Sequence, residues 1–187
     1  MKRIYLIRHG LPDFPNGQRQ CIGSTDLPLS GEGLLQASEM ARALPAVSAV
    51  FSSPLTRAMD TARAIRPDLI LLEGLRELDY GQWEGLTVPK IRRVYPELYA
   101  ARAKDLSLPP PGAESREAGL ARFSAAMEEA VRRSPGDLAV VAHGGIIALF
   151  LERVTGQWYK PNYCEIVTLK WDESGIFHQE ELSCGKC

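Results

Sequence analysis

The sequence predicts an α/β protein, a three-layer α/β/α sandwich whose mostly parallel sheet has an antiparallel edge strand. Short apolar runs rich in β-branched residues alternate with longer segments of helical periodicity, which is typical of a parallel sheet covered by helices on both faces. The last two apolar runs are joined only by residues 172–175, which indicates a hairpin and hence an antiparallel edge. Because 187 residues suffice for one core and are few for two, we expect a single domain over residues 1–187.

Six strands are expected, and each is a run of mostly apolar residues: 3–8, 46–53, 68–75, 137–143, 164–171 and 175–182. Helices are expected between them, at 28–44, 53–65, 114–133 and 144–154, with a less regular helical segment at 86–103 that prolines interrupt. Ser30 is the expected N-cap of the first helix. In the second helix, Ser53 is the expected N-cap and Pro54 the first helical residue.

Charge and hydropathy narrow the function classes. Lysine and arginine total 22 against 23 aspartate and glutamate, so we expect no nucleic-acid partner. No run approaches the roughly 20 apolar residues that span a bilayer, and the apolar run after the basic start is short for a signal peptide. We therefore expect a cytoplasmic monomer or homodimer that acts on a small molecule and not at a membrane.

The four cysteines are too few and too scattered for the disulfide framework of a small secreted domain. Cys21 and Cys164 stand alone, whereas Cys184 and Cys187 form a CxxC motif with His178 nearby. A metal or redox site is one interpretation of that motif. It lacks a second pair of zinc ligands and lies in the last four residues, so we favour reduced thiols in a solvated tail.

Polar residues recur at one kind of place, the point where a predicted strand ends. Arg8 and His9 follow the first strand, Arg57 begins the helix after the second, Glu77 follows the third and His143 ends the fourth. Because ligands of open α/β sheets bind outside the carboxyl ends of the strands, these five residues are expected to meet at one rim. Each alone could be a solvated charge or a scaffold histidine, but the five together indicate a site.

These residue types suit phosphoryl transfer. Two guanidinium groups can hold a phosphate dianion, one imidazole can attack phosphorus, the other can stabilise the equatorial oxygens, and the carboxyl group can donate a proton. With so many fixed cations, a metal ion is optional. The sequence has no G-x-x-x-x-G-K-[ST] loop, no HxH pair for a dinuclear metal site and no cysteine phosphatase loop, which leaves His9 as the nucleophile.

Six blocks of the sequence, in order, resemble one family. They are "LIRHG", "DLPLSGEG", "SSPLTRAMDTA", "LRELDYGQWEG", "PPGAES" and "VVAHGG". Together they resemble the histidine phosphatase superfamily, in its phosphoglycerate mutase-like branch. The likeness runs from residue 3 to about residue 155, which is most of the chain.

The resemblance implies a role for each residue of the rim. His9 matches the histidine that becomes phosphorylated, and His143 matches the second histidine of the pocket. Arg8 and Arg57 match the arginines that bind phosphate, and Glu77 matches the carboxyl group that acts as acid and base. The family carries out this step without a metal ion or cofactor, and its fold is the sandwich predicted above.

Three further residues are expected to bind substrate. Gly144 directly follows the second histidine, and Tyr80, with Phe14 and Trp83, could form an aromatic wall for a base or ribose or could simply pack. Asn16 stands one place later than the asparagine of many relatives. It either contacts phosphate or forms the turn that an NG dipeptide favours.

The sequence resembles a phosphatase more than a mutase. Leu78 follows Glu77 where phosphoglycerate mutases have an arginine, and the segment over 86–113 is short. Among phosphatases, "CIGSTDLPLSGEG" and "PPGAES" most resemble the α-ribazole phosphatases of cobalamin assembly, which suggests α-ribazole 5′-phosphate as a substrate. A mutase and a non-catalytic phosphate-binding protein on the same scaffold remain as alternatives.

Overall fold

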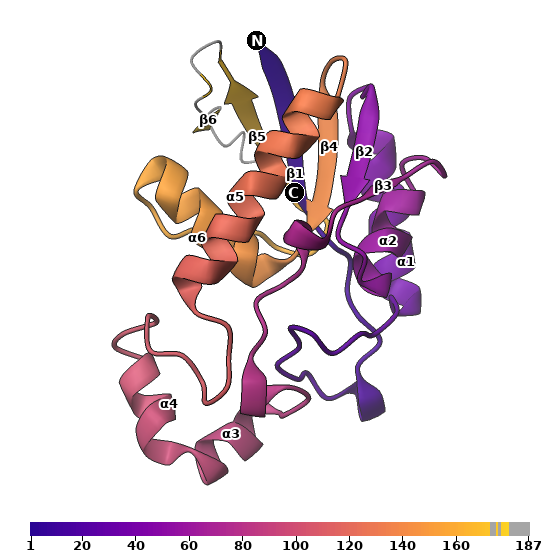
Figure 1. Cartoon of the computed structure of the whole chain (residues 1–187). Helices are drawn as coiled ribbons and strands as arrows, with labels where there is room; N and C mark the ends of the chain where they lie inside the picture. Colours follow the sequence, from indigo (N-terminus) through magenta and orange to yellow (C-terminus); the bar gives the residue numbers. More distant parts are fainter. Residues whose placement is uncertain (173–174, 176, 180–187) are drawn as a thin grey trace.

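The computed structural model describes residues 1–172, 175 and 177–179 and has a six-stranded sheet with helices on both faces (Figure 1). The strand order is β3-β2-β4-β1-β5-β6, in which β1, β2, β3 and β4 are parallel and β5 runs antiparallel to β1 and β6. The strands are β1 (Lys2–Arg8), β2 (Ala49–Ser52), β3 (Ile70–Leu71), β4 (Leu138–Ala142), β5 (Ile166–Trp171) and β6 (Phe177–Gln179). The predicted α/β fold class is confirmed.

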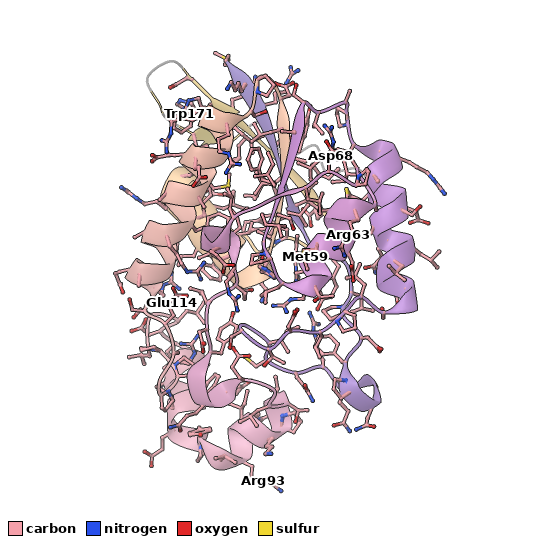
Figure 2. The ribbon with its side chains drawn as sticks, turned by 45° about the vertical axis from the view of Figure 1, so that its right-hand side comes forward. Met59, Arg63, Asp68, Arg93, Glu114 and Trp171 are labelled. Carbon is pink, nitrogen blue, oxygen red and sulfur yellow. The ribbon has the colours of Figure 1, made fainter. Side chains whose placement is uncertain are left out.

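Six helices accompany these strands: α1 (Gly31–Ala43), α2 (Thr56–Arg63), α3 (Val88–Val94), α4 (Pro96–Arg102), α5 (Arg116–Arg133) and α6 (Gly144–Thr155). Helices α1 and α2 cover one face of the sheet, and α5 and α6 cover the other (Figure 1). The short helices α3 and α4 lie beyond the carboxyl ends of the strands. Figure 2 shows this elongation, with Arg93 of α3 at the opposite end of the molecule from Trp171 of β5.

The protein has two hydrophobic clusters, one on each face of the sheet, because successive side chains of a strand point to opposite faces. Ile4 and Leu6 of β1 pack in the cluster with α5 and α6, whereas Tyr5 and Ile7 pack in the cluster with α1 and α2. Helix α6 is buried over its first eight residues, because it packs on the sheet and against α5. The sheet is therefore covered on both faces, and its carboxyl edge is where polar side chains can gather.

Several predicted elements begin or end differently in the structure. Ser30 caps α1 as predicted, through a 3.0 Å hydrogen bond from the Gly33 N–H. The helix expected at 53–65 is present as α2, but its predicted start and N-cap were wrong: the helix begins at Thr56, its N-cap is Leu55, and Ser53 directly follows β2. The expected strand 68–75 is paired only at Ile70–Leu71, because a 3-10 turn follows it.

The end of the chain is described only in part. Strands β5 and β6 are antiparallel, as the expected hairpin requires, and β5 lies one position inside the edge that β6 forms. Residues 180–182 of the last expected strand lie outside the described residues. The same holds for Cys184 and Cys187, so the structure does not test the CxxC motif.

Candidate active site

The two predicted site histidines meet because they follow neighbouring strands. Strands β1 and β4 pair in parallel with Arg8 opposite Ala142, so His9 and His143 leave the sheet side by side. Their ring centroids lie 5.1 Å apart, and both side chains are buried. The chain continues from β1 and from β4 toward opposite edges of the sheet, and ligands of open α/β sheets bind at such a switch point.

The ring of His9 is held in one tautomer. Its Nδ1 lies 2.7 Å from the carbonyl oxygen of Gly10, and Nδ1 must carry the proton because a carbonyl oxygen only accepts. Burial and the nearby Arg57 guanidinium hold the pKa of His9 well below its usual range, and they outweigh the hydrogen bond to Gly10. Near neutral pH the ring is uncharged and Nε2 has a free lone pair, which a nucleophile needs.

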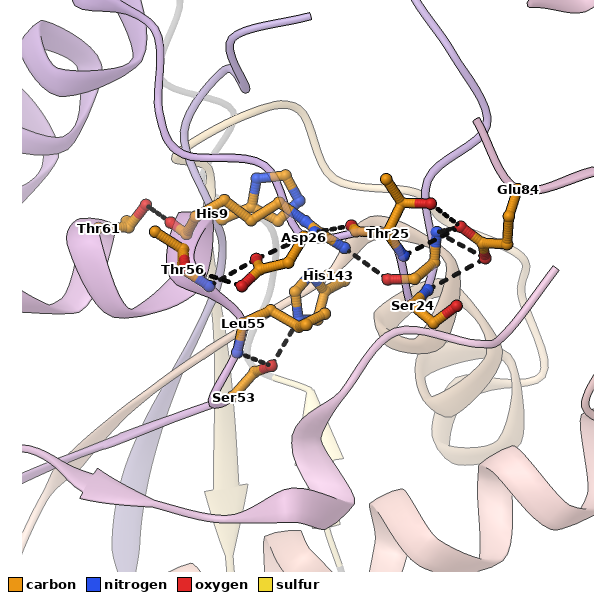
Figure 3. A network of polar contacts seen from close by, with 12 residues as sticks. His9, Ser24, Thr25, Asp26, Ser53, Leu55, Thr56, Thr61, Glu84 and His143 are labelled. Carbon is orange, nitrogen blue, oxygen red and sulfur yellow. Dashed lines mark hydrogen bonds and ion pairs between the residues drawn. The ribbon is translucent and has the colours of Figure 1, made fainter. Parts of the chain in front are cut away.

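The ring of His143 is oriented by Ser53, the residue expected to cap α2. Its Nε2 lies 2.7 Å from Ser53 Oγ, which also accepts a 3.3 Å hydrogen bond from the Leu55 N–H (Figure 3). Burial and Arg57 hold the pKa of His143 well below its usual range, so this ring too is uncharged. Nδ1 is buried and has no hydrogen-bond partner in the part of the chain that the structure describes.

Arg57 is completely buried in the first turn of α2 and is held by main-chain oxygens. Its two terminal nitrogens donate to the carbonyl groups of Thr25 and Gly23, at 2.8 and 2.9 Å. Asp26 lies 3.9 Å from the guanidinium and accepts two 2.8 Å hydrogen bonds from Thr56, so its carboxylate fixes the start of α2 (Figure 3). Nε of Arg57 is left without a partner among the described residues.

The loop that holds this guanidinium is organised by Glu84 (Figure 3). The carboxylate accepts hydrogen bonds of 2.6 to 3.1 Å from the N–H groups of Gly23, Ser24, Thr25 and Tyr80 and from the Thr25 hydroxyl. Burial alone would raise the pKa of Glu84, but these hydrogen bonds outweigh burial and the pKa lies below its usual value. Glu84 is therefore a charged anchor for the loop.

Arg8 reaches the site from the end of β1. Its Nη1 donates a 2.8 Å hydrogen bond to the carbonyl oxygen of Pro161, and its guanidinium carbon lies 3.9 Å from the centroid of the Tyr163 ring. Nε is buried with no hydrogen-bond partner in the described chain. A Cβ atom on Gly144 would lie 2.8 Å from this Nε, so a glycine at position 144 lets the guanidinium approach the first turn of α6.

Glu77 lies at the amino end of α6, where free N–H groups and the helix dipole favour an anion. Its carboxylate accepts hydrogen bonds from the N–H groups of Leu78, Gly145 and Ile146, at 2.9, 2.8 and 2.7 Å. A Cβ atom on Gly145 would lie 2.5 Å from the Tyr80 hydroxyl and 2.8 Å from the Glu77 carboxylate. Burial and Glu77 raise the pKa of Tyr80 well above its usual value, so the hydroxyl keeps its proton.

Arg122 of α5 fixes the segment that carries Glu77. It donates hydrogen bonds of 2.7 to 2.9 Å to the carbonyl oxygens of Gly74, Arg76 and Glu77, and it also pairs with Glu114 at 2.7 Å. The sequence offered no signal for this role, since an arginine on a surface helix is ordinarily a solvated charge.

A cavity of about 110 Å³ lies in front of these groups. Of the predicted residues it is lined by Arg8, His9, Glu77, Tyr80 and Gly144. The other polar residues of its wall were not predicted as site residues from the sequence. They are Arg19, Gln20, Cys21, Lys160 and Tyr163. Arg57 and His143 are completely buried and lie beside His9 rather than in the wall.

Lys160 is the main cation that the sequence analysis missed. The residue is exposed as a whole, yet neighbouring groups desolvate its ammonium and lower its pKa. Its Cε would lie 2.9 Å from a Cβ atom on Gly144, so the side chain passes the first turn of α6. Lys160 comes to this rim because β5 runs antiparallel to β1, which places the start of β5 beside Arg8.

Two other predicted residues lie away from the cavity. Asn16 is exposed, has a φ of 55° and belongs to the short turn Pro15–Gly17, as an NG turn requires. It is not among the residues that line the cavity. Of the aromatic residues, Tyr80 and Phe14 line the cavity, whereas Trp83 is buried and its ring lies 6.2 Å from that of Tyr95.

Within residues 1–172, 175 and 177–179 the structure shows no group of three or more histidine, cysteine or carboxylate side chains placed to bind a metal ion. Among the same residues, none of the helices has the length and apolar character needed to cross a bilayer.

The model of the histidine phosphatase superfamily, branch 1, matches residues 4–180. The chain belongs to this superfamily. It is 36% identical over 160 residues to a bifunctional protein of Mycobacterium tuberculosis, in a match that covers 82% of this chain but 41% of that longer protein. It is 34% identical over 164 residues to the glucosyl-3-phosphoglycerate phosphatase of the same organism, and this match covers 79% of this chain and 72% of the relative.

Solved structures of the family have the same fold. The mycobacterial glucosyl-3-phosphoglycerate phosphatase in complex with VO3 superposes with a TM-score of 0.85 at 28% identity, over 96% of this chain and 98% of that one. The α-ribazole phosphatase from Shigella flexneri gives a TM-score of 0.80 at 23% identity, over 95% and 94% of the two chains. At that identity the second likeness supports the fold alone.

Proposed function

We propose that this protein is a phosphomonoesterase that hydrolyses a small phosphate ester through a phosphohistidine formed on His9. The observation that carries the proposal is the state of the His9 ring, which is neutral, tied through Nδ1 to Gly10 and free at Nε2. Arg8 and Arg57 each have an Nε atom without a partner in the described chain, and these are the donors that an anion would take.

In the first step, Nε2 of His9 forms a bond to phosphorus and the bond from phosphorus to the ester oxygen breaks. Arg8 and Arg57 neutralise the charge on the equatorial oxygens, and the uncharged ring of His143 stabilises one of them through a hydrogen bond. Glu77 gives a proton to the departing oxygen.

In the second step, a water oxygen forms a bond to phosphorus and the bond from phosphorus to His9 breaks. Glu77 takes the proton that the water loses, so one carboxyl group serves first as acid and then as base. This cycle leaves the enzyme unchanged and releases inorganic phosphate and an alcohol. Fixed cations neutralise the phosphate throughout, so we expect the reaction to proceed without a metal ion or cofactor.

Three candidate substrates and a non-catalytic alternative can be separated by experiment. α-Ribazole 5′-phosphate is a candidate from the sequence blocks at 21–33 and 110–115. The relative named glucosyl-3-phosphoglycerate phosphatase points instead to a phosphoglycerate that carries a sugar. A phosphoglycerate mutase would interconvert phosphoglycerates in the presence of bisphosphoglycerate, and a non-catalytic protein would bind phosphate esters without turnover.

The test is a panel of phosphate monoesters compared by kcat/KM, because discrimination between substrates lies in that ratio. It contains p-nitrophenyl phosphate, glycerol phosphate, α-ribazole 5′-phosphate, glucosyl-3-phosphoglycerate and a coupled mutase assay, before and after exhaustive chelation. We expect phosphate release that survives chelation. Absence of release from every ester would overturn the proposal, and loss with EDTA that a divalent ion restores would overturn its metal-free form.

A further inference from the structure

A second cavity, of about 160 Å³, adjoins the 110 Å³ cavity lined by Arg8, His9 and Glu77, which we call the phosphate cavity. The two share Tyr80 and Lys160 in their walls. Gly145, whose N–H holds the Glu77 carboxylate, lines the second cavity. Because the departing oxygen of a substrate must lie next to Glu77, the group attached to that oxygen can extend into this space, which we call the outer cavity.

Part of the wall of the outer cavity is apolar. This part is formed by Trp158, Leu106, Pro109, Pro110 and Leu78. Trp158 and Leu106 keep 42% and 46% of their surface exposed, so their apolar surface is available to a ligand instead of being packed in the core. A cavity of roughly 150 Å³ holds a molecule of the size of benzene, so one six-membered ring suits this volume.

The wall of the outer cavity also carries cations. Arg116 is paired with Glu152 at 2.6 Å and lies 5.3 Å from the Trp158 ring. The guanidinium of Arg102, by contrast, donates to the main-chain oxygen of Leu108, and no carboxylate pairs with it in the described chain.

Lys160 has no hydrogen-bond or ion-pair partner among the described residues. Two carboxylates also line the cavity, and one of them is neutralised: Glu114 pairs with Arg122. The other, Asp79, accepts a 2.6 Å hydrogen bond from the Gly81 N–H. Within the described ranges, the outer cavity therefore has two cations without an ion pair, Arg102 and Lys160, and one such carboxylate, Asp79. The net charge of these groups is positive.

We infer that the outer cavity binds the leaving group of the substrate, and that this group has a ring-sized apolar body and a second anionic group held by Arg102. The inference rests on the proposed function, since it names the class of ester that the phosphate cavity acts on. A cation beside an apolar wall binds a ligand with an apolar ring and an anionic group more tightly than a neutral ligand of the same size. The reason is that a hydrogen bond between charged groups is stronger than one between neutral groups.

Two probes of matched shape test this inference. They are 4-(carboxymethyl)phenyl phosphate and its carbamoyl analogue, which differ in charge at the far end of the ring. We expect the wild-type protein to prefer the carboxylate by about tenfold in kcat/KM, as one charged hydrogen bond provides. The preference should fall as salt rises from low to high concentration, because screening weakens the pair.

Arg102→Met should bring the ratio of the two kcat/KM values close to one, because methionine keeps part of the stem and removes the charge. The matched control is Arg93→Met on the exposed α3, which lies away from the outer cavity and should keep the wild-type ratio (Figure 2). A wild-type ratio near one, a ratio that does not depend on salt, or an unchanged ratio in Arg102→Met would each overturn the inference.

The failure of this inference is distinguishable from failure of the proposed function. If the carbamoyl probe and p-nitrophenyl phosphate are hydrolysed while the carboxylate gives no advantage, the phosphatase stands and the anion subsite falls. If the carboxylate probe, the carbamoyl probe and p-nitrophenyl phosphate all fail to release phosphate, the phosphatase itself is refuted. The ratio and its salt dependence need only the wild-type protein, so a ratio near one or a ratio insensitive to salt overturns the inference even if Arg102→Met does not fold.

Discussion

The phosphate cavity and the outer cavity meet at Tyr80 and Lys160, yet they are built differently. The five residues that the sequence predicted for the phosphate cavity lie near strand ends and helix starts and are buried, and Arg57 is held by two main-chain carbonyl oxygens. The outer cavity is formed largely by loop residues and by exposed side chains such as Trp158. The sheet therefore holds the groups of the proposed phosphate chemistry, whereas loops form the cavity proposed for the leaving group.

This difference predicts that substitutions at the phosphate cavity change all substrates alike, whereas substitutions at the outer cavity change some of them. Glu77 is informative because it lies between the two. Its effect should depend on how good the leaving group is, since a poor leaving group needs a proton and a good one does not.

The largest graded effect is expected for Glu77→Gln. Alkyl phosphates should lose on the order of a hundredfold or more in the rate of the first step, because a general acid contributes that much. Aryl phosphates should lose less, since a nitrophenolate leaves without a proton. The measurement is single-turnover kinetics with glycerol phosphate and p-nitrophenyl phosphate. Equal losses for the two esters would show that Glu77 is not the acid.

A smaller effect, about tenfold in kcat/KM, is expected for Glu84→Gln, and it should be the same for alkyl and aryl esters. The glutamine amide would place N–H donors against the N–H groups of loop 23–25, and the loop would hold Arg57 less firmly. Because hydrogen bonds to charged groups are worth about 1.5–3 kcal/mol each, the free energy of unfolding should also fall.

The matched control for Glu84→Gln is Glu97→Gln, since Glu97 is exposed in the first turn of α4. This control should leave both kcat/KM and the free energy of unfolding unchanged. A loss in Glu84→Gln that differs strongly between alkyl and aryl esters would contradict the anchoring role and indicate proton transfer by Glu84 instead.

The sequence predicted which polar residues meet at the carboxyl edge of the sheet, because those residues follow strands. His9 and His143 come directly after two apolar strands, so the strand-end rule alone brings them together. Glu77 was placed by the same rule, although β3 is only two residues long and a 3-10 turn intervenes. The misplaced residue was Ser53, because a distant loop residue, Asp26, fixes the start of α2 and frees Ser53 to contact His143.

The outer cavity was not predicted, because it depends on contacts between segments distant in sequence. Lys160 reaches the rim only through the antiparallel pairing of β5 with β1, which no local pattern in the sequence specifies. Arg102 reaches it at the end of α4, a short helix on an irregular segment. The phosphate-binding role suggested for Asn16 depended on an asparagine that stands one place later than in many relatives. The structure places this residue in an exposed turn.

The smallest expected effect is a pH dependence of stability that comes from the buried histidines. The pKa values of His9 and His143 are lowered by folding, so the unfolded chain takes up protons first as the pH falls below about 6.5. Stability is therefore full above that pH and is lost below it, at up to about 1.4 kcal/mol per pH unit for each histidine.

Urea unfolding at a series of pH values measures this slope. The variant His9→Gln should reduce the slope below pH 6.5 by about one proton, because it removes one of the two buried groups. A slope that does not change in His9→Gln would mean that His9 is not held neutral by the fold.

The most direct test of the central claim is to trap the phosphorylated enzyme. The variant Glu77→Gln lacks the base for the second step, so it should accumulate the intermediate when it reacts with p-nitrophenyl phosphate. After a rapid quench, peptide mapping should find an acid-labile phosphoryl group on His9 and none in the double variant that also carries His9→Gln. A phosphoryl group on another residue, or steady turnover by His9→Gln, would contradict the mechanism.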